Sequence, residues 1–146
     1  EPLSGGGLAV TDRDLVAKKL ARIATCLHEL RTLASVDRLR ADVREERFVE
    51  HTLQIAIQSA LDVASHIASD QRLGEPETNR ALFQLLARGD VISPDHAQRL
   101  AEMAGFRNVL VHGYDDVQIQ IVEDVVRNHL GDLDEFVAAV KRHLDR

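Results

Sequence analysis

Apolar residues recur at intervals of three and four along most of this chain, which is the periodicity of amphipathic α-helices. The first such segment follows a Thr11-x-x-Asp14 capping pattern and continues to about Ala34. The second runs from Val43 to about Ser69, and alanines on its apolar face would allow close packing against a neighbour. The first half of the chain therefore predicts two long helices.

Glycine and proline divide the second half of the chain into shorter segments. Gly74 and Pro76 interrupt the apolar pattern, and Thr78 can then cap a short helix that continues through Arg88. Gly89 follows at once and is a typical helix terminator. This segment predicts a third helix.

Two more helices are predicted after Gly89. Ser93 fits an N-cap and Pro94 the first helical position of a helix whose apolar residues extend to Leu110. After the turn "GYDD", apolar positions from Val117 to Leu144 predict a single fifth helix. Alternating strand patterns and internal repeats are absent from the sequence. We therefore expect an all-α fold, an antiparallel bundle of about five helices.

Length and composition are consistent with one helical domain over residues 11–146, preceded by a flexible lead over residues 1–10 that contains Gly5–Gly7. The single Cys26 cannot form an internal disulfide, and its place in an apolar stripe predicts a buried thiol. No apolar run approaches the roughly 18 residues of a membrane span, and the N-terminus has no signal-peptide pattern. We expect a cytoplasmic protein that does not contact a membrane.

The chain is acidic, with a net charge of −6. This is the wrong sign for a protein that coats nucleic acid through a broad basic face. Any RNA contact must therefore be local, in a small arginine-lined groove, and the acidic surface leaves room for a protein partner.

The stretch "RNVLVHGY" gathers the residues with the clearest chemical potential, Arg107, Asn108, His112 and Tyr114. Asn108 and His112 are four residues apart and share a helix face, and Gly113 would end the helix just before Tyr114. Histidine exchanges protons near neutral pH and arginine is a planar phosphate ligand. The pattern suits phosphodiester cleavage. Because the sequence has no carboxylate and histidine cluster at metal-ligand spacing, we predict a metal-independent route without a cofactor, in which the RNA 2′-hydroxyl attacks the adjacent phosphate.

A structural interpretation of the same residues is open. An Arg-x4-His string is short enough to arise by chance, and a histidine at a helix C-terminus often only caps carbonyl groups. Tyr114 can be a packing residue with its hydroxyl in water. Spacing alone does not choose between these interpretations.

The motif Arg-Asn-x-x-x-His-x-Tyr resembles the signature of the HepT-like branch of the HEPN superfamily, the ribonuclease toxins of HepT/MntA toxin–antitoxin pairs. The segments "QIAIQSALDVASHIASD", "FQLLARGDVISPDHAQRLAEMAGF" and "HLGDLDEFVAAV" resemble that family in order and spacing. The resemblance covers roughly residues 47–144, and the N-terminal helix fits only by position and amphipathicity.

The resemblance implies a homodimeric HEPN bundle that acts as the toxin of a type VII-like toxin–antitoxin pair. Arg107 and His112 match the catalytic pair and Asn108 its polar companion. Tyr114 matches the tyrosine that an MntA-like nucleotidyltransferase antitoxin adenylylates. Dimerisation would bring two motifs to one RNA cleft, and assembly with the antitoxin into a larger hetero-oligomer is open.

Asp62 and His66 resemble a pair that the family commonly shows, and their spacing of four on the second predicted helix would allow them to touch. They either support catalysis in the groove or hydrogen-bond within the bundle. His51, His96, His129 and His143 share no spacing typical of a metal site, and we assign them no role.

Two other functions compete with the ribonuclease. The first is a noncatalytic helical binding module, such as an accessory subunit of a nucleotidyltransferase. The second is a HEPN-type domain that binds nucleotides without cutting RNA.

Overall fold

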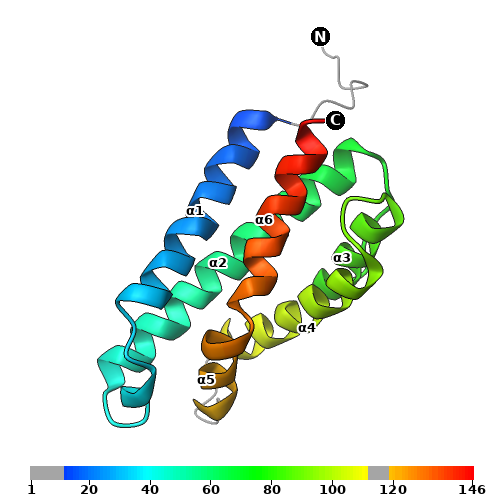
Figure 1. The fold of residues 1–146 in the computed structure, drawn as a ribbon. Helices are drawn as coiled ribbons and strands as arrows, with labels where there is room; N and C mark the ends of the chain where they lie inside the picture. The colour runs from blue at the N-terminus through cyan, green and yellow to red at the C-terminus, as the bar shows by residue number, and fades with distance from the viewer. Residues whose placement is uncertain (1–11, 112–118) are drawn as a thin grey trace.

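The computed structural model describes residues 12–111 and 119–146, and these are helical apart from short connections (Figure 1). The predicted flexible lead, residues 1–10, lies outside the described residues. No strand occurs in the described ranges, so the all-α prediction is confirmed. The elements are α1 (Arg13–Thr32), η1 (Val36–Arg38, a 3-10 turn), α2 (Val43–Asp70), α3 (Asn79–Arg88), α4 (Pro94–Val111), α5 (Ile119–Asn128) and α6 (Leu130–Leu144).

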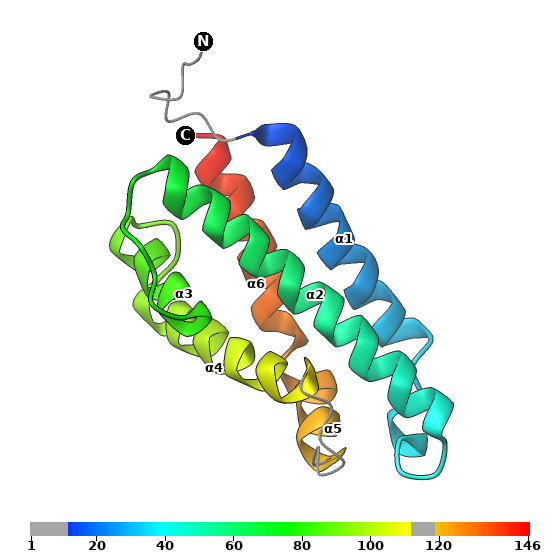
Figure 2. The ribbon, with the colours of Figure 1, turned by 180° about the vertical axis from the view of Figure 1, so that it is seen from behind.

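Two helical hairpins form the bundle. The long helices α1 and α2 lie side by side and run in opposite directions, and α3 and α4 form a shorter hairpin that packs against α2 (Figures 1 and 2). Helix α6 packs against α1, α2 and α4 and thereby joins the hairpins. The side chain of Arg13 donates a hydrogen bond to the carbonyl oxygen of Leu144, which ties the start of α1 to the end of α6.

The helix starts show which capping predictions hold. The hydroxyl of Thr78 accepts a hydrogen bond from the amide of Ala81, and Ser93 Oγ accepts one from the amide of His96, as the sequence predicts. The cap of α1 differs from the prediction. Asp12 is its N-cap and accepts from the amide of Leu15, because a carboxylate directly before the helix reaches its free amides.

The predicted fifth helix is wrong as a single element. It is two helices, α5 and α6, that meet at His129, where the backbone has φ −124° and ψ 0°. The Asp124 carboxylate accepts hydrogen bonds from Asn128 at 2.7 Å and from the His129 ring at 3.0 Å, and Gly131 is the second residue of α6. These local bonds and the low helix propensity of glycine favour a break. The apolar spacing continues across it, so periodicity did not reveal the join.

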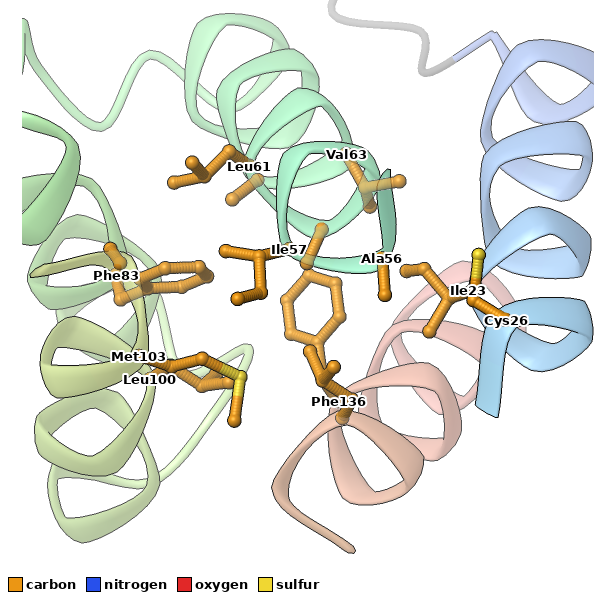
Figure 3. Packing of buried hydrophobic residues seen from close by; sticks show 14 of the residues in the cluster. Ile23, Cys26, Ala56, Ile57, Leu61, Val63, Phe83, Leu100, Met103 and Phe136 are labelled. Atoms are coloured by element: carbon orange, nitrogen blue, oxygen red, sulfur yellow. The ribbon is translucent and has the colours of Figure 1, made fainter. Parts of the chain in front are cut away.

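The core is one hydrophobic cluster to which all six α-helices contribute. At its centre the rings of Phe83 and Phe136 meet edge to face with centroids 5.9 Å apart, and Ile57 points toward them from α2 (Figure 3). Cys26 is buried, as predicted, and burial raises the pKa of its thiol. No helix in the described part of the chain is long and apolar enough to cross a membrane.

Candidate functional site

The last turns of α4 carry the first half of the predicted motif. Arg107 is half-buried and Asn108 is exposed, and α4 ends at Val111. His112 and Tyr114 lie outside the described residues, so their placement stays a prediction. The site can therefore be built outward from Arg107.

Arg107 lines a pocket of about 240 Å³ between α1, α2 and α4. The pocket brings together Arg107 and Asp62, two of the site residues that the sequence predicts. His66 is not among its lining residues. The residues that line the pocket are Arg22 from α1, His51, Gln54, Ile55, Gln58, Ser59 and Asp62 from α2, and Arg107 from α4.

The Arg107 guanidinium has an unsatisfied donor. Its Nε is buried and has no hydrogen-bond partner among the residues that the structure describes. A buried donor without a partner costs about 1–3 kcal/mol, and a planar guanidinium binds phosphate through parallel hydrogen bonds. Arg107 is therefore suited to bind an anion.

Asp62 is the carboxylate of this pocket and its charge is already paired. Lys19 Nζ lies 3.0 Å from one carboxylate oxygen, and Gln58 donates to the other at 2.8 Å. Because Lys19 neutralises Asp62, the arginines decide the sign of the potential in the pocket.

His66 makes its contacts away from this pocket. Its Nε2 accepts a hydrogen bond from the backbone amide of Asp12 at 3.0 Å, and it lies 3.8 Å from a carboxylate oxygen of Asp70. No hydrogen bond joins His66 to Asp62 among the contacts of the described residues. These bonds link the start of α1 to α2, which favours the bundle-internal interpretation for His66.

The end of α4 is also held by α2. Gln54 Nε2 donates a long hydrogen bond of 3.4 Å to the carbonyl oxygen of Leu110, two residues before His112. Glu50 lies one turn before Gln54 on α2, and its pKa is raised to about 7. Burial is the main cause and the neighbouring Glu46 carboxyl adds to it, while Arg47 has a smaller opposing effect. The first half of the motif thus lies on a helix end that α2 contacts.

The start of α4 is fixed by ionic contacts to α6. Arg99 binds the carboxylates of Asp132 and Glu135 and also that of Asp95 on its own helix. The buried ring of His96 lies 2.9 Å from the carbonyl oxygen of Asp132 and 3.3 Å from a carboxylate oxygen of Glu135. These contacts set the position of α4 relative to α6.

Sequence reasoning missed Arg22, His51, Gln54 and Gln58 as pocket residues. One signal was present, because His51, Gln54, Gln58 and Asp62 recur at spacings of three and four and therefore share a face of α2. Arg22 had no such signal, since its place depends on how α1 packs against α2. In residues 12–111 and 119–146, no group of three or more His, Cys, Asp and Glu side chains could hold a metal ion.

Comparison with known proteins identifies the family. The family model described as "Ribonuclease HepT-like" matches residues 22–140, which include most of α1 as well as the segments that carried the resemblance. The chain belongs to the HepT-like ribonuclease family. Its helical bundle is therefore a HEPN fold.

Curated relatives of this HepT-like chain are nucleases. The "mRNA nuclease HepT" of Shewanella oneidensis is 31% identical over 129 residues, which are 88% of this chain and 97% of the relative. The "tRNA nuclease HepT" of Aphanizomenon flos-aquae is 34% identical over 83 residues, which are 57% of this chain and 56% of the relative.

Comparison with solved structures supports the same family. A tri-AMPylated HEPN toxin of Shewanella oneidensis in complex with its MNT antitoxin superposes with a TM-score of 0.82 at 31% identity, covering 88% of this chain and 98% of the toxin. A toxin–antitoxin complex with AMP-PNP gives a TM-score of 0.83 at 30% identity, with the same coverage. The YutE protein of Bacillus subtilis gives 0.83 at 16% identity and supports the fold alone.

Proposed function

We propose that this HepT-like protein is the RNA-cleaving toxin of a type VII-like toxin–antitoxin pair, with Arg107 and His112 as its catalytic residues. The observation that carries the proposal is that Arg107 lines a pocket and that its buried Nε has no hydrogen-bond partner among the residues that the structure describes. Arg107 begins an Arg-x4-His motif inside the region that matches the ribonuclease family. An arginine that lines a pocket and has an unsatisfied donor is better explained by phosphate binding than by a purely structural role.

The proposed reaction uses the RNA's own 2′-hydroxyl as nucleophile. The 2′-oxygen attacks the adjacent phosphorus and the bond from phosphorus to the 5′-oxygen breaks. The products are a 2′,3′-cyclic phosphate and a 5′-hydroxyl. His112 takes the 2′ proton or gives a proton to the leaving 5′-oxygen, and Arg107 stabilises the charge that develops on the phosphate oxygens. Asn108 orients His112 or the phosphate.

We further propose that an MntA-like nucleotidyltransferase silences the toxin by adenylylating Tyr114. The Shewanella oneidensis relative, which is AMPylated and bound to an MNT antitoxin, supports this partner. Tyr114 lies two residues from His112 in the chain, so an attached AMP would place negative charge and bulk beside the catalytic residue. This group would repel and exclude the RNA phosphate.

The proposed active form is a homodimer in the cytoplasm, where both RNA and the antitoxin's nucleotide are available. Val109 and Val111 at the end of α4 are 44% and 43% exposed. Apolar side chains beside a catalytic motif are suited to an interface between two copies. Such an interface would bring two motifs to one cleft.

The deciding experiment is cleavage of total cellular RNA in EDTA by unmodified protein, with intact mass recorded to exclude attached AMP. We expect cleavage by the wild type and by Tyr114→Phe, and cleavage reduced about 100-fold or more in His112→Ala and Arg107→Ala. A dimeric wild type without added mass that leaves RNA intact would instead support a noncatalytic binding module. Nucleotide titration of that inactive protein would reveal a nucleotide-binding HEPN domain.

A further inference from the structure

We propose that Arg22 of α1 and His51 of α2 bind a backbone phosphate of the RNA in the pocket that Arg107 lines. The inference rests on the proposed ribonuclease function and names the residues that hold the substrate. Neither residue belongs to the Arg-x4-His motif, and they reach the pocket from different helices. The RNA site would then extend from the end of α4 across α2 to α1.

Arg22 differs from the other arginines of its helix. Arg13 donates to the Leu144 carbonyl and Arg31 pairs with Asp134, so both join α1 to α6. Arg22 has no ion pair or side-chain hydrogen bond to any described residue, and it lines the pocket. An arginine that stabilises no contact within the bundle is available for a ligand.

The charges in the pocket favour an anion. Asp62, the carboxylate among the lining residues, is paired with Lys19 from outside the pocket. Arg22 and Arg107 are not offset by a carboxylate among the contacts of the described residues. The pocket is therefore a local positive site on a chain whose net charge is −6.

The polar groups and the size of the pocket suit one phosphate with part of its sugar. An imidazole such as His51 and amides such as Gln54 and Gln58 can donate hydrogen bonds to phosphate oxygens. A volume of about 240 Å³ would hold several water molecules of about 30 Å³ each, which a phosphate and its ribose can displace.

The test separates binding from cleavage by using a short 2′-O-methyl oligoribonucleotide, which lacks the attacking hydroxyl. Its affinity for the unmodified full chain is measured by fluorescence anisotropy at several salt concentrations. We expect Arg22→Ala to weaken binding about tenfold, in line with the loss of a charged hydrogen bond. The salt slope should fall by about 0.7 for the lost phosphate contact. His51→Ala should weaken binding by about threefold, and Arg22→Lys should recover part of the loss.

Arg88→Ala is the matched control. Arg88 is exposed and lies outside the pocket lining, and its substitution removes the same charge as Arg22→Ala. It should change affinity by less than about twofold. If Arg22→Ala binds the oligonucleotide as Arg88→Ala does, the inference is overturned. Circular dichroism and the thermal midpoint of each variant confirm that the comparison is made between folded proteins.

Kinetics on cleavable RNA keeps this inference apart from the proposed function. A contact made equally with substrate and transition state changes KM more than kcat, so Arg22→Ala should raise KM about tenfold and leave kcat within about twofold. If the wild type cleaves RNA and Arg22→Ala has an unchanged KM, the proposed role of Arg22 is rejected and the ribonuclease proposal stands. A wild type that binds the oligonucleotide through Arg22 but cuts no RNA would reject the ribonuclease proposal alone.

Discussion

Arg99 and Arg107 lie about two turns apart on α4 and have opposite surroundings. Arg99 at the start of the helix binds Asp95, Asp132 and Glu135, so its charge is used within the fold. Arg107 at the end has a buried Nε with no partner in the described part of the chain. One helix therefore carries an arginine whose charge is paired within the fold and another that lines a pocket and has no ion pair among the described residues. We propose that the first arginine stabilises the fold and that the second serves the function.

The largest expected effect is that of Arg107→Ala on cleavage. Removal of a group that stabilises transition-state charge typically costs about 100- to 1000-fold in rate. We expect that loss in kcat/KM on a defined RNA, while the free energy of unfolding in urea stays equal or rises, because an unsatisfied buried donor is removed. A fall in stability with intact cleavage would reverse the roles assigned to the two arginines.

Arg99→Ala should show the reverse pattern. Its loss leaves Asp132, whose side chain is only 13% exposed, without its arginine partner. We expect the free energy of unfolding to fall by about 2 kcal/mol and cleavage by folded protein to stay within about twofold. Urea denaturation with Arg88→Ala as control measures the first quantity. A variant as stable as that control would mean that the ionic contacts of Arg99 do not anchor α4.

Glu50 extends the comparison to a carboxyl group on α2, one turn before Gln54, the residue that contacts the end of α4. Its pKa is raised from 4.5 to about 7. Between these two pH values the folded protein keeps a proton on Glu50 that the unfolded chain has released. The stability that this proton contributes is present below about pH 4.5 and is lost as the pH rises through about 7.

Glu50→Gln should remove that pH dependence. Because the group is partly exposed, solvent screening reduces the effect to about 1 kcal/mol. We expect the variant to match the wild type at low pH and to exceed its free energy of unfolding by that amount above the raised pKa. The exposed Glu77→Gln serves as control, and an equal gain there would remove the special role of Glu50.

The smallest expected effect tests the balance of charge beside Arg107. Asp62→Asn removes the carboxylate that Lys19 neutralises, so the pocket gains one positive charge. We expect the 2′-O-methyl oligonucleotide to bind about two- to threefold more tightly at low salt, with the gain screened at high salt. Weaker binding would mean that Asp62 contacts the RNA itself or holds Lys19 for that contact.

Much of the fold was readable from the sequence, because helix starts and stops depend on local residues. Ser93, Thr78 and Gly89 mark ends that the structure confirms. The division at His129 was missed because the apolar positions keep their spacing on both sides of it. The cap at Asp12 was missed because Thr11 and Asp12 are both good capping residues in a sequence, and the pattern with Asp14 favoured Thr11.

The candidate site was predictable only in part. The motif and the family resemblance located Arg107, but the pairing of charges depends on which helices become neighbours. Asp62 and His66 have the spacing of a contacting pair, yet Lys19 and the amide of Asp12 bind them instead. Arg22 carried no local sign of its place in the pocket. Tertiary packing, which periodicity does not encode, supplies these partners.

The buried Cys26 thiol makes local opening of this protein measurable by chemical labelling. As the sole cysteine it offers a thiol reagent one target, and at 4% exposure that target is shielded where α1 faces α2 (Figure 3). Labelling must await an opening that separates these helices, so its rate measures how often the hairpin comes apart. Arg22 lies on α1 and His51 on α2 of the same hairpin. If bound RNA contacts both helices, it should stabilise the hairpin and lower the rate at which Cys26 is labelled.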